Sequence, residues 1–324
     1  MIKTTRLYQF AILFFLAVIV IISCNGFLPK NDKNVSDSFI SDAGAVTVPV
    51  PLPTKATFAT ELVPMNLFYV REGLDRELTL NTYWHSNTLL LFKRANRFFP
   101  TIERILKQNM VPEDFKYIVL IESGLLNVTS PAGAGGYWQF LPETAKEYGL
   151  EVSTTVDERL HIEKATQAAC RYFLESYKKY GSWTVVAAAF NGGQGRMKRI
   201  IKHQATQDFY EMYTNSETGR YIYRILAVKL IFENPESYGF RLKQEDLYPV
   251  IPFKSVTVNS DIKSLVSFAK SNGTTYRLLR EMNPWLVDTL LTVKPSKSYE
   301  IRIASGAFND YDRLIREQVN NGRK

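Results

Sequence analysis

The stretch from residue 117 to residue 150 most constrains the fold, because it sets one acid between an apolar run and a glycine-rich turn. Tyr117 to Ile121 carries no charge, which predicts a buried helix segment. Glu122 follows directly, so its carboxyl group should lie where that helix leaves the core. Burial and the negative end of a helix dipole both disfavour a carboxylate, which raises its pKa. Glu122 is therefore a candidate general acid, although a helix-terminal Glu paired with a Lys or Arg fits the same position.

The turn after Glu122 has a composition that suits a carbohydrate site. The segment from Ser130 to Gly136 contains three glycines, which allow positive φ and a close approach of backbone to ligand. The next residues, Tyr137, Trp138, Gln139 and Phe140, place aromatic rings beside an amide. Rings can stack on sugar faces, and amides can bond to hydroxyl and acetamide groups. A core position fits the two rings of Trp138 and Phe140 equally well.

Three motifs in this order resemble those of lytic murein transglycosylases, and most closely those of the membrane-bound type D subgroup. They are Glu122-Ser123, the run from Ser130 through Trp138-Gln139-Phe140, and Ala187-Ala-Ala-Phe-Asn-Gly192. The resemblance extends from Phe115 to Ile231. It implies a mainly α fold with a lysozyme-like helical catalytic domain similar to goose-type lysozyme.

The resemblance also implies a reaction. The residue matching Glu122 protonates the glycosidic oxygen between N-acetylmuramic acid and N-acetylglucosamine and then acts as a base, while the muramyl O6 attacks and forms a 1,6-anhydro product. No second acid stands at a motif position near Glu122, whereas ordinary glycosidases use two carboxylates. The implied substrate-binding residues are Ser123, Ser130, Tyr137, Trp138, Gln139, Phe190, Asn191 and Tyr221.

Three of these positions have features of their own. Phe190 stands where the family commonly has Tyr, so one hydroxyl is missing. Asn191 is followed by two glycines, so the alternative role for it is a helix C-cap without any contact to substrate. Tyr221 matches a substrate-lining tyrosine, with a surface-facing helical Tyr as the alternative. Two other functions stay open: a hydrolytic muramidase, which shares the Glu and the helical fold, and a non-catalytic peptidoglycan-binding scaffold. The product of the reaction distinguishes the first alternative.

The N-terminus predicts export and a lipid anchor. Residues 1–23 combine a basic start, an apolar run and a small residue before Cys24, as in a lipoprotein signal peptide, with an uncleaved signal anchor as the alternative. Residues 24–60 are rich in polar residues and Val-Pro repeats, which predicts a flexible tether. We expect attachment to a membrane through a lipid on Cys24, in the bacterial cell envelope, at the outer membrane facing the periplasm.

The catalytic domain is predicted over residues 61–245, and a small module over residues 248–304. Its predicted order is strand, helix, helix, strand, with the strands at Phe253–Val258 and Ser298 to Ala304. This order resembles LysM, which binds N-acetylglucosamine polymers. The usual opening Gly-Asp-x-Leu is replaced by Asn259-Ser-Asp-Ile262, so glycan binding by this module stays open. Residues 305–324 are expected to be a tail.

Composition limits the partners. The net charge of +8 suits an anionic polymer or membrane surface, or simply a soluble surface. No Lys/Arg cluster is interleaved with aromatic residues, so nucleic acid is not expected. The three histidines, His85, His161 and His203, are scattered, and we expect no metal and no cofactor. The expected partners are peptidoglycan glycan strands, and the chain is expected to be a monomer.

Overall fold

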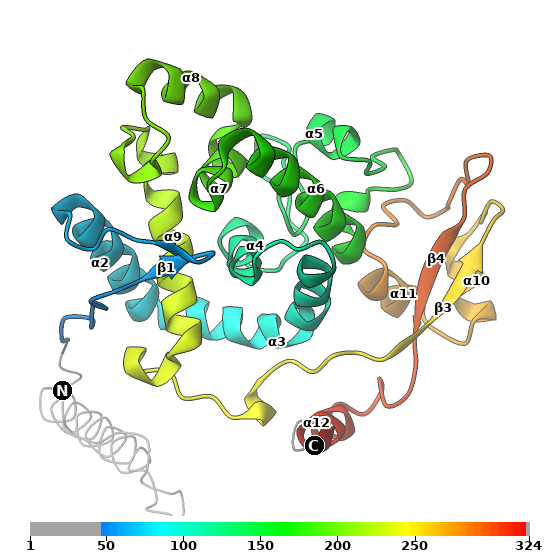
Figure 1. The fold of residues 1–324 in the computed structure, drawn as a ribbon. Coiled ribbons are helices and arrows are strands. Elements are labelled where there is room, and N and C mark those ends of the chain that lie inside the picture. Colours follow the sequence, from blue (N-terminus) through cyan, green and yellow to red (C-terminus); the bar gives the residue numbers. More distant parts are fainter. Residues whose placement is uncertain (1–46, 322–324) are drawn as a thin grey trace, which may run out of the picture. The chain divides into compact units, whose positions relative to one another are not determined.

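Helices dominate the residues that the computed structural model describes, 47–321 (Figure 1). The described strands form two antiparallel pairs, β1 with β2 and β3 with β4. The expected mainly α fold class is confirmed. The helices are α2 (Phe68–Tyr83), α3 (His85–Gln108), α4 (Lys116–Ser123), α5 (Pro142–Glu147), α6 (Ile162–Tyr180), α7 (Trp183–Gly192), α8 (Gln194–Gln204), α9 (Ser216–Glu233), α10 (Leu265–Ser271), α11 (Tyr276–Met282) and α12 (Tyr311–Asn321); the strands are β1 (Thr57–Phe58), β2 (Glu61–Leu62), β3 (Phe253–Val258) and β4 (Tyr299–Ala304).

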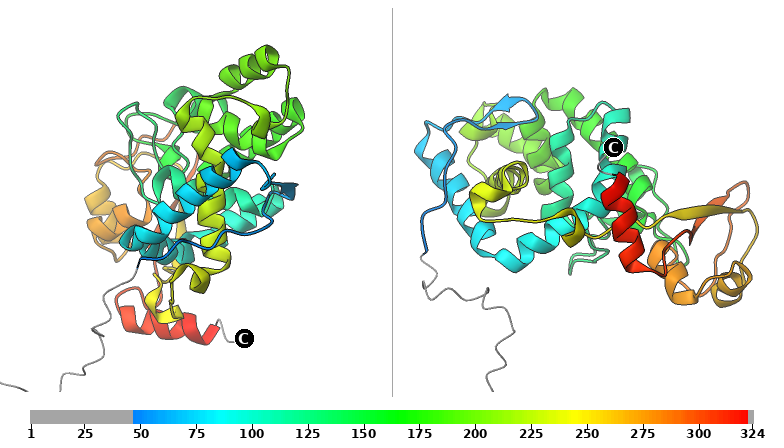
Figure 2. Two further views of the ribbon diagram at one scale, coloured as in Figure 1. Left: turned by 90° about the vertical axis from the view of Figure 1, so that its left-hand side faces the viewer. Right: turned by 90° about the horizontal axis from the view of Figure 1, so that it is seen from below.

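The short helix α4 lies inside the larger group of helices. It packs against α3 and α9, while α2 runs along α9 and α6 packs against α3 and α7 (Figures 1 and 2). Its residues Tyr117, Ile118, Val119 and Leu120 are all buried. The helix ends because Gly124 adopts a left-handed conformation with φ of 59°. The buried helix that the sequence predicts before Glu122 is therefore present.

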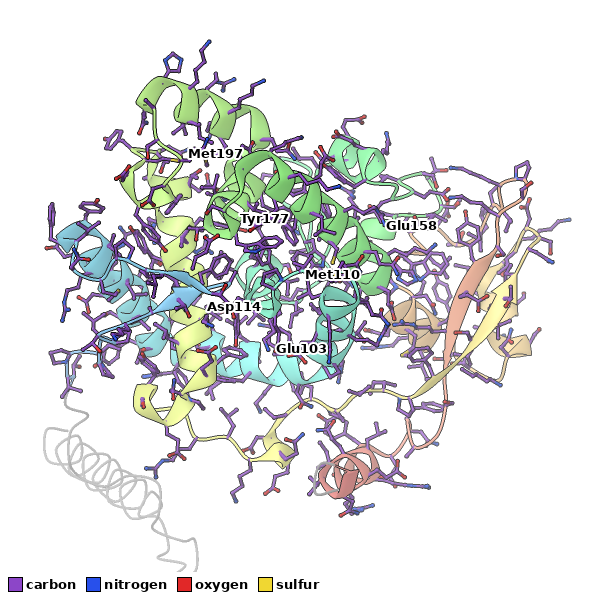
Figure 3. The ribbon with its side chains drawn as sticks, viewed as in Figure 1. Glu103, Met110, Asp114, Glu158, Tyr177 and Met197 are labelled. Atoms are coloured by element: carbon purple, nitrogen blue, oxygen red, sulfur yellow. The ribbon has the colours of Figure 1, made fainter. Side chains whose placement is uncertain are left out.

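The segment before α2 packs on these helices, which corrects the predicted end of the tether. Phe58 has no exposed surface, and its ring centroid lies 5.4 Å from that of Phe115. The backbone amide of Ala59 donates to Asp114 Oδ2 at 2.7 Å; Asp114 is labelled in Figure 3. Glu61 accepts hydrogen bonds from two backbone amides in the first turn of α7, at 2.5 and 2.9 Å. The tether cannot reach residue 60, because burial of Phe58 holds this segment in place. The signal peptide, Cys24 and the tether up to residue 46 lie outside the described residues.

The C-terminal module has the predicted order of elements. β3 pairs with β4 in a register that runs from Phe253 opposite Ala304 to Val258 opposite Tyr299. Between the strands, α10 and α11 supply apolar side chains to a separate core that includes Leu265, Leu279 and Ile301. The expectation of a strand-helix-helix-strand module is confirmed.

The module is bonded to the loop between α5 and α6. The amide of Asp157 donates to the carbonyl of Trp285 at 2.9 Å, and that of Val287 donates to the carbonyl of Thr155 at 3.1 Å. Glu151, whose side chain is 3 % exposed, pairs with Lys294 at 2.8 Å and with Lys297 at 2.7 Å. Main-chain bonds and a buried carboxylate thus fix the module to the helical part.

The residues after β4 are not simply a tail. α12 covers most of them, and its Leu314 is 4 % exposed. The side chain of Gln318 accepts a hydrogen bond from the amide of Val250 at 3.2 Å, so α12 lies beside the segment that links α9 to β3 (Figure 2). The expected tail is corrected in this respect. Within residues 47–321, no helix combines the length and apolar character needed to cross a membrane.

Candidate active site

Glu122 stands at the end of α4 and lines a cleft of about 790 Å³. Burial raises the pKa of its carboxyl group, and this effect exceeds the lowering by a hydrogen bond from Tyr221 and by the charge of Arg224. Arg224 is held at this place by a 3.1 Å hydrogen bond to the carbonyl of Ile121. A carboxyl group with a raised pKa can keep its proton until a substrate oxygen takes it.

Tyr221 on α9 makes the shortest contact to this carboxyl group. Its hydroxyl donates to Glu122 Oε1 at 2.5 Å, and the residue is only 1 % exposed. Burial raises the pKa of the Tyr221 phenol well above its usual value, so the phenol stays protonated and acts as a donor. The alternative of a surface-facing tyrosine is wrong.

Asn191 lies in the last turn of α7, beside the first turn of α9. Its Oδ1 accepts from the Thr218 hydroxyl at 3.0 Å, and its Nδ2 donates to Glu217 Oε1 at 3.4 Å. Gly193, with φ of 83°, is the C-cap of α7, so capping does not need the Asn191 side chain. Contact of Asn191 with a substrate stays a prediction.

Ser123 connects α4 to the glycine-rich turn. Its hydroxyl donates to the carbonyl of Tyr137 at 2.8 Å, and the residue is 8 % exposed. It also lines the cleft. In this structure the hydroxyl positions the turn relative to Glu122, and a direct contact with substrate stays a prediction.

The turn itself is held by internal hydrogen bonds. A Cβ at Gly136, where φ is 75°, would lie 1.9 Å from the carbonyl oxygen of Arg159, so only glycine fits there. Gln139 Nε2 donates to the carbonyl of Gly136 at 2.7 Å and to that of Val128 at 2.9 Å. Ser130 Oγ accepts from a backbone amide within the turn at 3.1 Å. Both predicted sugar-binding side chains therefore bond to the turn, and their role toward substrate remains untested.

The predicted stacking role of Trp138 is corrected, because the ring has no exposed surface. Its Nε1 donates to Thr166 Oγ1 at 3.0 Å, and it lies edge-on to Phe190. Phe190 also packs within this aromatic cluster. Tyr137 is 5 % exposed, and its hydroxyl accepts from Asn127 Nδ2 at 3.1 Å. The Trp138 ring therefore belongs to the core, because a side chain with no free face cannot stack on a sugar.

The cleft holds two acids besides Glu122. Glu77 on α2 is buried and bonded to Arg220 at 2.8 Å. Glu217 on α9 is exposed, and its charge contributes to the raised pKa of Glu122. The expectation of a site with a single carboxylate is therefore corrected, because Glu217 lines the same cleft as Glu122. Glu217 begins the Glu217-Thr-Gly-Arg-Tyr221 segment, which resembles the family's Glu-Thr-x-x-Tyr segment, and that resemblance was the available signal.

Two family models match the chain at the places just described. Residues 99–213 match the Transglycosylase SLT domain, and residues 254–307 match the Soluble lytic transglycosylase C-terminal LysM-like domain. The chain thus carries a transglycosylase SLT domain. The SLT match contains Glu122, the glycine-rich turn and Asn191, and ends before Tyr221. The family resemblance and the LysM-like module are both confirmed.

The chain is similar to several known proteins. The membrane-bound lytic murein transglycosylase D of Escherichia coli (strain K12) is 31 % identical over 183 residues, which cover 55 % of this chain and 40 % of that protein. The chain therefore spans about two fifths of the length of this relative. The 70 kDa soluble lytic transglycosylase of Escherichia coli is 23 % identical, with a TM-score of 0.37 and coverage of 43 % of this chain and 24 % of that one. A complex of the 70 kDa enzyme with bulgecin A is 19 % identical, with a TM-score of 0.39 and coverage of 58 % and 32 %.

Proposed function

We propose that this chain is a lytic transglycosylase that cleaves the β-1,4 bond between N-acetylmuramic acid and N-acetylglucosamine in peptidoglycan and leaves a 1,6-anhydromuramyl end. The observation that carries the proposal is the state of Glu122, a carboxyl group with a raised pKa that faces a cleft and bonds to Tyr221 at 2.5 Å. The SLT domain match and the murein transglycosylase relative support the same substrate class.

The geometry at Glu122 suits a proton that is first given and then taken back. Because Tyr221 donates to Oε1, the other carboxyl oxygen, Oε2, is left to carry the proton. Transfer of that proton to the glycosidic oxygen breaks the bond to the muramyl anomeric carbon. The muramyl acetamide stabilises the cation that develops, and O6 attacks this carbon while its proton passes to Glu122. The Tyr221 hydrogen bond and the charge of Arg224 stabilise the carboxylate in between, because both favour its ionised form. No water is consumed.

A hydrolytic muramidase is the second candidate, and the presence of Glu217 in the cleft is the observation that favours it. Ordinary glycoside hydrolases use a second carboxylate, either as a base that activates water or as a nucleophile that forms a covalent bond to the anomeric carbon. In the transglycosylase reaction O6 takes the place of water, so Glu217 has no proton to remove.

Two amide substitutions test the roles of these acids. We expect Glu122→Gln to lower turnover by about 100- to 10,000-fold, because an amide cannot donate the proton. We expect Glu217→Gln, the matched control in the same cleft, to retain most of the turnover and the same product. Turnover of Glu122→Gln above a tenth of the parent rate, with unchanged thermal stability, would exclude Glu122 as the acid. A comparable loss in both variants would favour the muramidase.

The proposal includes the cellular setting predicted from the sequence. The leader and Cys24 support export and attachment through a lipid, and the matched relative is described as membrane-bound. The setting is then the bacterial cell envelope, with the domain held at the outer membrane and facing the periplasm. The LysM-like module is proposed to act on the same glycan strands, and the chain is proposed to be a monomer without cofactor or metal.

A further inference from the structure

A second cavity continues the catalytic cleft toward the LysM-like module. It has a volume of about 640 Å³ and lies between the helical part and the module, with Phe98 on one side and Trp285 on the other. Arg94 and Leu126 line both this cavity and the cleft that contains Glu122. A glycan in the cleft therefore has a place beside it for a group attached to the sugar.

Arg94 on α3 lies at the junction of the two cavities and forms no ion pair or side-chain hydrogen bond with residues 47–321. Its Nε is buried and has no hydrogen-bond partner, and no carboxylate of residues 47–321 lies within 4.0 Å of its guanidinium. A Cβ at Gly124 would lie 3.5 Å from its Nη2. The guanidinium therefore lies beside Gly124, which follows Glu122 by two residues in the sequence. Burial lowers the pKa of Arg94, and this effect exceeds the rise caused by the coulombic interaction with Tyr248.

The neighbouring arginines differ from Arg94 because each has a partner. Arg220 pairs with Glu77 at 2.8 Å. Arg97 donates from Nε to the carbonyl of Pro249 at 2.9 Å. Arg302 forms an ion pair with Glu163 on α6. The bonding capacity of these residues is at least partly used, whereas that of Arg94 is open toward the cavities.

The charges around the second cavity favour an anion. Arg94, Arg97 and Arg302 line it, and Glu281 is the one acidic residue among its lining side chains. Buried polar groups in native proteins are nearly always bonded, so the unpaired buried Nε of Arg94, on a half-buried side chain that lines both cavities, indicates a missing ligand. The planar fork of Arg matches a carboxylate better than any neutral group.

We propose that Arg94 binds a carboxylate carried by the muramyl residue of the substrate. This inference rests on the proposed function. In peptidoglycan such a carboxylate has two sources: the peptide stem, or the lactyl group of strands from which the peptide has been removed. N-acetylglucosamine polymers carry neither, so the site would distinguish peptidoglycan from chitin.

The test compares Arg94→Gln with Arg104→Gln, each placed in the Glu122→Gln protein so that binding is measured without turnover. Arg104 is a suitable control, because it is exposed on the same helix and lines neither cavity. Calorimetry measures the Kd for three ligands: peptide-bearing glycan strands, the same strands stripped of peptide, and a chitin oligosaccharide. A urea unfolding curve for each variant measures the structural cost.

We expect Arg94→Gln to weaken binding of carboxylate-bearing strands by about 10- to 100-fold, while chitin binding and the urea midpoint stay equal to those of Arg104→Gln. Arg94→Lys, which keeps the charge and loses the fork, should lie between the two. A loss on peptide-bearing strands alone assigns the carboxylate to the stem, a loss on stripped strands alone assigns it to the lactyl group, and a loss on both shows that either is accepted.

Two results would overturn this inference and leave the proposed function intact. One is an equal loss of affinity for all three ligands in Arg94→Gln, which would indicate a structural role for Arg94. The other is no loss of affinity for any of them. Failure of the parent Glu122→Gln protein to bind any of the three would instead overturn the proposed function, and this inference with it.

Discussion

Replacing Tyr221 with Phe removes one hydrogen bond to the proposed acid and keeps the buried ring. The hydroxyl donates to Glu122 Oε1 at 2.5 Å and favours the ionised carboxylate, so its loss should raise the pKa of Glu122 further. A hydrogen bond to a charged group contributes about 1.5–3 kcal/mol, which corresponds to a rise of about 1–2 pKa units. A general acid works in its protonated form, so the rate falls as pH rises through this pKa. We therefore expect the basic limb of the kcat/KM profile to move upward by about 1–2 pH units.

The assay is the pH profile of kcat/KM on soluble glycan strands, for Tyr221→Phe and for Tyr223→Phe. Tyr223 lies on the same helix, is half-buried and packs against Gly73, so its substitution controls for the loss of a tyrosine hydroxyl on α9. We expect its profile to equal that of the parent. A basic limb that stays in place in Tyr221→Phe, or that moves to lower pH, would show that the hydrogen bond does not set the pKa of the acid.

Two stability predictions concern the segment before α2 and the attachment of the C-terminal module. Phe58→Ala should lower the free energy of unfolding by about 3–5 kcal/mol in urea titrations, because the ring is fully buried. The control, Leu62→Ala, changes a site that is 76 % exposed and should alter this free energy little. Equal effects of the two substitutions would contradict the corrected tether boundary. Burial alone would raise the pKa of Glu151, but hydrogen bonds from two lysines and Tyr299 outweigh it and lower the pKa to about 2. A depressed folded-state pKa stabilises the fold above about pH 4.3, the unfolded value, and this stability is lost as pH falls toward 2. Glu151→Gln should therefore destabilise the protein at pH 7 by roughly 1.5 kcal/mol and reduce the loss of stability between about pH 4.3 and about pH 2. The exposed control Glu143→Gln should do neither. If the stability of the two variants depended on pH in the same way, the ion pairs of Glu151 would not hold the module to the helical part.

The sequence predicted the elements that depend on local pattern. The strand from Phe253 to Val258 has the expected bounds, because the alternation of its side chains defines it locally. The position of Glu122 at the end of a buried helix was also predictable, since the uncharged run before it can only be buried.

Features set by distant contacts were not predictable. Phe58 lies in a Pro- and Thr-containing stretch typical of a linker, and its burial depends on Phe115, which is far along the chain. The rings of Trp138 and Phe140 suited either a sugar or a core, and only the packing around them in the folded chain decides for the core. Glu217 enters the cleft because α9 lies beside α4, which no short motif encodes.

Arg94 gave no signal in the sequence, because a single Arg on an amphipathic helix is usually a solvated surface residue. Its significance comes from an absence of partners that only coordinates can reveal. The sequence pattern predicts burial and periodicity, but it does not show which polar groups find a hydrogen-bond partner in the folded chain.

The most direct measurement of the proposed function is digestion of purified peptidoglycan in water enriched in heavy oxygen, followed by mass spectrometry of the muropeptides. Holding O6 next to the anomeric carbon can contribute about 7–11 kcal/mol in effective concentration, which bulk water cannot match. We expect anhydro-muropeptides without label. Muropeptides with reducing ends that carry heavy oxygen would contradict the transglycosylase and identify a hydrolase.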